Sequence, residues 1–211
     1  MKRMHFAAAL LALAFVACKN RDEIKVKDGK VSLPDAVAAA KKMGEEVKKS
    51  QGRWEERKAK GDTAALPYKE LETYLPEVSG YTKDGGPKGS QMSMGGFGNF
   101  SETSQRYENG DKKIRIKIVD WNNSQTGLMG ATAAYRMGFS FEDDNKKQGP
   151  VDLGISDVAG YETIYKKRND CQLAIVAGDR FIIEIDADNS SDIDELKSIA
   201  KSIVSGLSSK F

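Results

Sequence analysis

Histidine is nearly absent from this 211-residue chain, in which the only one is His5. Because His5 lies in an amino-terminal segment that we expect to be removed, the remaining chain contains no imidazole. This excludes Ser-His-Asp and Cys-His catalysis, histidine acid–base chemistry and nearly all zinc sites. We therefore expect a protein that is not an enzyme.

Cysteine is also scarce, since the chain holds only Cys18 and Cys171. If Cys18 is modified, Cys171 has no partner within the chain for a disulfide, so the fold must depend on its apolar core. Cys171 begins an apolar run that continues to Ala177, and no histidine is available to lower the pKa of its thiol. We interpret Cys171 as a small core residue rather than a nucleophile.

Long apolar runs are missing outside residues 6–17, and this run is shorter than the roughly 20 residues that a membrane-spanning helix needs. Lys2 and Arg3 precede it and the small residue Ala17 ends it, a pattern that indicates an export signal peptide. We expect residues 1–17 to be removed. The mature chain is then not expected to cross a bilayer.

The end of this leader, Phe15-Val16-Ala17-Cys18, resembles the bacterial lipobox. In that motif the cysteine is acylated on sulfur by diacylglycerol and becomes the first residue of a mature lipoprotein. The resemblance covers the leader alone. It implies that Cys18 is the lipidation site and that acyl chains hold the protein on a membrane, at about 0.8 kcal/mol per buried methylene. Because Lys19 rather than aspartate follows, it also implies the outer membrane, with the protein facing the periplasm or the cell surface.

The charge balance of the mature chain argues against a polyanionic partner. Loss of Lys2 and Arg3 lowers the 33 basic residues to 31, which equals the number of acidic residues. A chain of zero formal charge has no overall field to attract nucleic acid, so we expect no nucleic-acid binding. Any anion binding would require a local basic patch.

The mature sequence divides into three segments. Residues 18–33 are polar and predict a lipidated tether. Residues 34–62 predict a long charged helix, with oppositely charged residues such as Lys41 and Glu45 four positions apart. Two interpretations remain open for it, a surface helix that rests on the domain and a stalk or partner-binding helix. Residues 64–208 are expected to form the domain.

For that domain we predict an α+β fold, a mainly antiparallel twisted sheet of about five to six strands with packed helices, preceded by the long amino-terminal helix. The expected strands are 99–108, 111–120, 150–158, 160–167, 171–177 and 180–186, with a further short strand at 139–141. The last two are apolar on both faces and should be central. Helices are expected at 66–75, from about 124 to 137, and at 191–207, the last capped by Ser191.

The dipeptide Asn109-Gly110 predicts a β-hairpin in which these two residues form the turn. That register places Arg106 opposite Lys113. The outer face of the hairpin is then mostly basic, so we identify a possible anion or partner contact at Arg106, Lys113, Arg115 and Lys117. The other interpretation is a solvated sheet face on which Glu102 pairs with Lys117.

No cofactor or metal is expected. The glycine- and methionine-rich stretch 84–98 lacks the lysine followed by Ser or Thr that closes a phosphate loop, and it is expected to be a loop. The acidic run 186–195 lacks the central glycine of a calcium loop and is better explained as a helix cap.

These observations favour a membrane-anchored lipoprotein of the bacterial envelope that acts as a non-enzymatic binding or accessory module. Its expected partners are the membrane, through the lipid, and another envelope protein. The alternative is a periplasmic carrier of a small ligand, or an enzyme that works without histidine, with a pocket near residues 84–98.

Overall fold

The computed structural model describes residues 33–94, 98–122, 128, 132 and 140–211. These residues are dominated by one antiparallel sheet of nine strands in the order β1-β3-β4-β9-β8-β7-β6-β5, with β2 paired to β3. The strands are β1 (Thr82–Lys83), β2 (Lys88–Met94), β3 (Gly98–Asn109), β4 (Lys112–Asp120), β5 (Phe141–Glu142), β6 (Lys146–Val151), β7 (Val158–Tyr165), β8 (Asp170–Ala177) and β9 (Phe181–Asp188).

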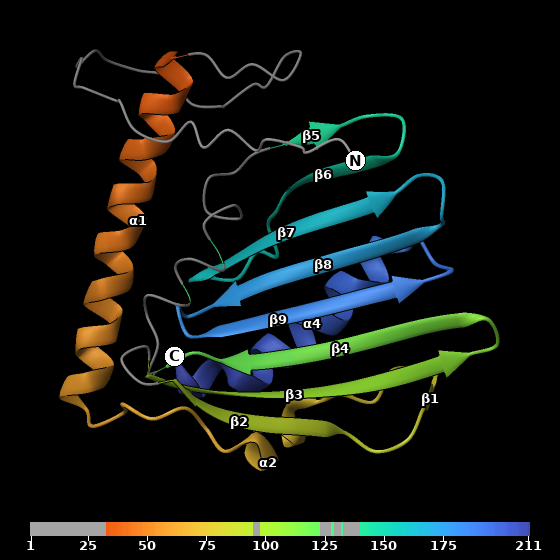
Figure 1. Ribbon diagram of the computed structural model, residues 1–211, viewed down its shortest axis with the longest axis horizontal. Helices are drawn as coiled ribbons and strands as arrows, with labels where there is room; N and C mark the ends of the chain where they lie inside the picture. Colours follow the sequence, from red (N-terminus) through yellow and green to blue (C-terminus); the bar gives the residue numbers. More distant parts are fainter. Residues whose placement is uncertain (1–32, 95–97, 123–127, 129–131, 133–139) are drawn as a thin grey trace, which may run out of the picture.

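The described helices are α1 (Leu33–Ala59), the short α2 (Tyr68–Leu71) and α4 (Ile193–Leu207), with single 3-10 turns at Glu72–Tyr74 and Ser208–Lys210. The helix α4 packs against β8 and β9 on one face of the sheet, whereas α1 stands at the end of the strands where β8 turns into β9 (Figure 1). The sheet, and not the amino-terminal helix, sets the architecture.

The predicted fold of five to six strands is therefore wrong, and the sheet is larger for identifiable reasons. Residues 88–94 form the strand β2, although glycine and serine made them resemble a loop. The strand expected at 150–158 is β6, displaced toward the charged residues Lys146 and Lys147. Both strands lie toward the edges of the sheet, where the described side chains are exposed or only partly buried and the alternation of apolar and polar residues is lost.

The core lies between the sheet and α4. The apolar stripe of this helix is buried, and it faces equally buried isoleucines such as Ile114, Ile183 and Ile185 from the two central strands. Asp192 caps the helix by accepting a hydrogen bond from the backbone N–H of Glu195 at 3.0 Å, so the expected cap at Ser191 is wrong by one residue. A smaller apolar cluster, which includes Val176 and Leu128, lies on the opposite face.

The hairpin of β3 and β4 is present, but its register differs from the prediction by two residues. Asn109 pairs with Lys112, so Gly110 and Asp111 form the turn. The expected Asn-Gly turn needs positive φ at both central residues, whereas here Gly110 has a φ of 62° and Asn109 stays out of that region. A shift of two residues keeps every side chain on its predicted face but changes every cross-strand partner.

Candidate functional site

The four predicted basic residues lie on the sheet face opposite α4, on neighbouring strands. Arg106 belongs to β3 and lies directly opposite Arg115 of β4, rather than opposite Lys113. The other side of β4 is paired with β9, and there Arg115 lies opposite Asp186. We call this surface the charged face. It comprises Glu102, Arg106, Glu108, Lys113, Arg115, Lys117, Glu184, Asp186 and Asp188.

Acids from both neighbouring strands neutralise the bases of β4. Arg115 donates two hydrogen bonds to Asp186, at 2.6 and 3.0 Å, and this contact raises the pKa of the arginine. Lys113 lies 3.2 Å from a carboxylate oxygen of Glu108. Lys117 lies 3.1 Å from Glu102. The sequence pattern showed that acids of β3 lie beside these bases, but it did not show the acids of β9. Local alternation does not tell which strands are neighbours in the sheet.

This arrangement changes what the charged face can bind. The three bases of β4 on this face have carboxylate partners within the sheet, so the surface around them presents alternating signs rather than a basic patch. Exposed ion pairs of this kind contribute only about 0–1 kcal/mol each. A partner whose own charges are complementary can therefore exchange with them at small cost. The geometry fits a protein surface of mixed charge better than a simple anion.

A hollow of about 290 Å³ lies on this face, over β3, β4, β8 and β9. Its lining includes four carboxylates and three bases. Those side chains are Asp84, Glu108, Asp186, Asp188, Arg106, Lys113 and Arg115. Among the described residues of the stretch 84–98, Asp84 alone lines this hollow. The pocket expected near that stretch stays a prediction.

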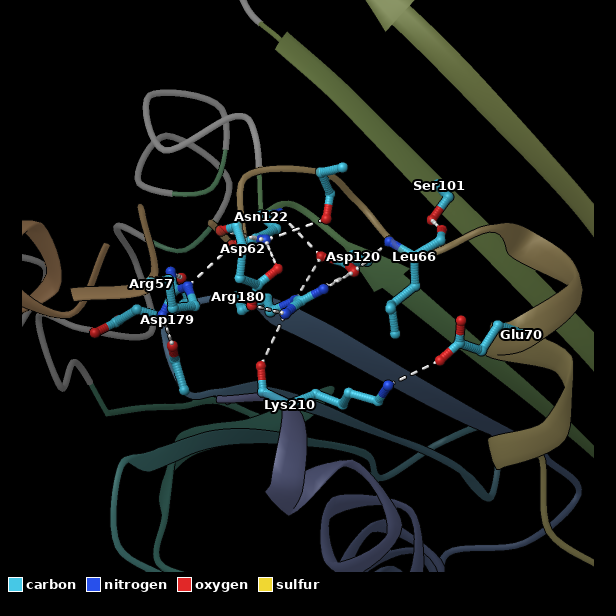
Figure 2. A network of polar contacts seen from close by, with 12 residues as sticks. Arg57, Asp62, Leu66, Glu70, Ser101, Asp120, Asn122, Asp179, Arg180 and Lys210 are labelled. Atoms are coloured by element: carbon cyan, nitrogen blue, oxygen red, sulfur yellow. Dashed lines mark hydrogen bonds and ion pairs between the residues drawn. The ribbon is translucent and has the colours of Figure 1, made fainter. Parts of the chain in front are cut away.

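A second polar cluster, which the sequence analysis missed, lies at the end of the sheet beside α1. Arg180, with 1% of its surface exposed, lies at the β8–β9 turn and donates to both carboxylate oxygens of the fully buried Asp120. It also donates to Asp62 at 2.7 Å and to the backbone carbonyl of Lys210 at 2.8 Å. Figure 2 shows that this guanidinium joins a sheet strand, the linker after α1 and the carboxyl-terminal segment.

The last turns of α1 are held by the same cluster. Arg57 is buried and donates to the side chain of Asn122 at 2.9 Å and to the backbone carbonyls of Gly178 and Asp179 at 3.0 and 3.2 Å (Figure 2). Burial, together with the nearby charge of Arg180, lowers the pKa of Arg57. One turn earlier in α1, Arg53 pairs with Asp179.

We call Arg57, Asp62, Asp120, Asn122, Asp179 and Arg180 the arginine cluster. Two sequence signals could have revealed it. Asp120 ends the apolar run of β4. Arg180 lies between two apolar strands, in a turn whose other residues are Gly178 and Asp179. A charge placed inside an apolar pattern is expected to be buried with a partner.

Burial keeps one thiol and one phenol, those of Cys171 and Tyr107, in their neutral forms. Burial raises the pKa of the Cys171 thiol to about 12, so the thiolate needed for nucleophilic attack is scarce at neutral pH. Burial likewise raises the pKa of Tyr107 to about 12, and its hydroxyl donates to the backbone carbonyl of Pro76 at 2.7 Å. In the part of the chain that the structure describes, no three metal-ligating side chains gather.

Two comparisons with known proteins gave no match: neither a family model nor a curated protein is similar to this chain. None of the described helices is both long and apolar enough to span a membrane. The leader and Cys18 lie outside the described residues, as does most of the helix expected after residue 120.

Proposed function

We propose that the protein is a lipid-anchored binding module of the bacterial envelope, attached through Cys18, which engages another envelope protein with its charged face. The observation that supports this best is the surface itself. A face of alternating charges on a large sheet, with a hollow of about 290 Å³ in it, has the chemistry of a polar protein contact.

The attachment of α1 supports the same proposal. This helix spans on the order of 40 Å at 1.5 Å per residue, and Arg53 and Arg57 bind its carboxyl-terminal half to the sheet. Because the lipidated residue precedes α1 in the sequence, the helix would connect the anchor to the domain. The helix would then hold the domain, and with it the charged face, away from the membrane surface.

The lipid anchor is tested separately from the partner. Intact-mass analysis of the membrane fraction should show a chain that starts at Cys18 and carries acyl groups, and Cys18→Ala should move the protein to the soluble fraction. A mature chain without lipid would contradict the anchor and leave the binding proposal to be judged alone.

The partner is tested by photo-crosslinking in cells, with the crosslinking residue placed at Lys113 on the charged face, at Gln172 of β8 in the hollow of that face, or at Lys201 on α4 as the control. We expect one defined envelope protein to be captured from the first two positions and not from the third. Arg115→Glu combined with Lys117→Glu should lower that yield by roughly tenfold, the effect of about 1.4 kcal/mol. Equal capture from all three positions, or an unchanged yield in the double variant, would contradict the proposal.

A further inference from the structure

The two edges of the sheet differ in length and in charge. At one edge, β5 has only two residues and is followed by the acidic Asp143 and Asp144. At the other, β2 has seven residues, Lys88–Met94, and pairs with β3 alone among the described strands. Within β2 only Lys88 is charged, and there is no proline. Proteins usually protect an edge with a short strand, charge or proline, and β2 has none of these along six of its residues.

Three consecutive side chains of β2 are open to contact. Gln91, Met92 and Ser93 are exposed, Met92 with 48% of its surface accessible. Support comes from the α4 side of the sheet, where the ring of Tyr68 in α2 packs so closely on Gly89 that a Cβ there would lie 2.3 Å from it. Pairing with β3 over seven register positions holds the strand in an extended conformation. The edge is thus an ordered template for another strand.

We propose that β2 pairs antiparallel with β2 of a second copy of this chain, centred on Gln91, to form one continuous sheet. This register pairs all seven residues of each strand. It places Lys88 opposite Met94 of the other copy, so no like charges meet across the join. A charged residue at the centre of the strand would lie opposite the same residue of the second copy, and the two like charges would repel. The central residue of β2 is the uncharged Gln91.

The symmetry of this pairing fits an anchored protein. A two-fold axis that relates antiparallel neighbouring strands is perpendicular to the sheet, so both copies turn their charged faces to the same side. The interface is small, so we expect a dissociation constant on the order of 10–100 µM in solution. Attachment of both copies to one membrane would raise their effective concentration. The pairing itself does not depend on the anchor or on the proposed function.

The test places a cysteine at the expected axis of the full chain and oxidises intact cells. Gln91→Cys should give a disulfide-linked dimer, because the two Cα atoms of a directly opposed pair lie within the range that a disulfide spans. Ser93→Cys is the matched control. It is also exposed and on the same side of the strand, but it lies opposite residue 89 and should give at least about fivefold less dimer. The Cys171 thiol is buried and should not react.

The original chain, which has no cysteine at position 91, is oxidised alongside, so that a dimer formed through an unacylated Cys18 is recognised. A dimer in this control would contradict the anchor, because Cys18 would then carry a free thiol, and the pairing is judged by the yield of Gln91→Cys above it. Absence of a Gln91→Cys dimer, equal yields at positions 91 and 93, or a crosslink to a different protein would overturn the proposed pairing.

Charge at the axis gives a second, independent measurement. Gln91→Lys and Gln91→Glu should each be monomeric by analytical ultracentrifugation of the purified full-length lipoprotein in detergent, because like charges would face each other. An equimolar mixture should associate, because the charges are then opposite. Self-association of either variant at the level of the original chain would overturn the proposal, and an unchanged melting temperature would show that the fold is intact.

Discussion

Two groups of basic residues in this molecule make similar ion pairs in different surroundings. In the arginine cluster, Arg180 meets Asp120 at 2.8 Å with both side chains almost fully enclosed. On the charged face, Arg115 meets Asp186 at 2.6 Å, but 55% of the arginine side chain is exposed. The distances are nearly equal, so distance does not distinguish the two pairs.

Burial separates them. An enclosed carboxylate that loses its cation cannot recover the lost interaction from water, whereas an exposed one is rehydrated. The arginine cluster therefore suits the task of fixing parts of the chain to one another. The charged face suits contacts that form and break. Pairs of arginine and aspartate therefore stabilise the fold at one end of the sheet, and on the charged face they are available to bind a partner.

The largest effect is expected for Arg180→Met. This change leaves Asp120 buried without its cation and also removes the hydrogen bond to the carbonyl of Lys210. We expect a loss of about 3–5 kcal/mol in the free energy of unfolding, measured by urea denaturation. The double variant with Asp120→Asn should recover part of the loss, because it removes the unpaired charge.

If Arg180→Met does not fold, the loss in the free energy of unfolding is measured on Arg180→Lys instead. It keeps the charge but loses the forked geometry with which the guanidinium reaches both Asp120 oxygens. Lys201→Met, on the exposed side of α4, is the control and should change stability by less than about 0.5 kcal/mol. A loss in Arg180→Met no larger than in this control would contradict the role of burial.

A smaller and more local effect is expected for Arg57→Met. The variant loses three hydrogen bonds that fasten α1 to the end of the sheet, and it leaves the side-chain oxygen of Asn122 without this donor. We expect a loss of roughly 2–3 kcal/mol and faster cleavage by protease within α1, while the sheet stays intact. Lys58→Met, exposed on the same helix, is the control. Equal cleavage rates in the two variants would show that Arg57 does not hold the helix.

The central part of the fold could be predicted from the sequence, because its pattern is strong. The strands at 171–177 and 180–186 correspond closely to β8 and β9, and the helix at 191–207 corresponds to α4. Apolar residues on both strand faces and a clear apolar stripe on the helix leave little choice of structure. The strand β2 could not be predicted in the same way, because its side chains are exposed and its conformation comes from pairing with β3.

For the candidate site, alternation along the chain placed the basic residues on one face but could not show what they meet. The acids opposite Arg115 and Lys117 are Asp186 and Glu184, about 70 positions later in the sequence. Pairing between strands so far apart depends on the order of strands in the sheet. The arginine cluster was missed for the same reason, since Arg57, Asp120 and Arg180 come from three distant segments.

The smallest effect on stability is expected for Arg115→Met, and it completes the comparison. The pair with Asp186 is exposed, so its loss should lower the free energy of unfolding by less than about 1 kcal/mol. Added salt should reduce even that difference, since ions screen exposed charges with a Debye length of about 3 Å at 1 M. Urea denaturation of Arg115→Met and Arg180→Met at low and high salt makes the contrast direct, because the deficit of the enclosed pair should persist in salt. A loss above 2 kcal/mol in Arg115→Met, or a deficit that salt leaves unchanged, would show that the charged face is part of the structural framework and would count against its use as a contact surface.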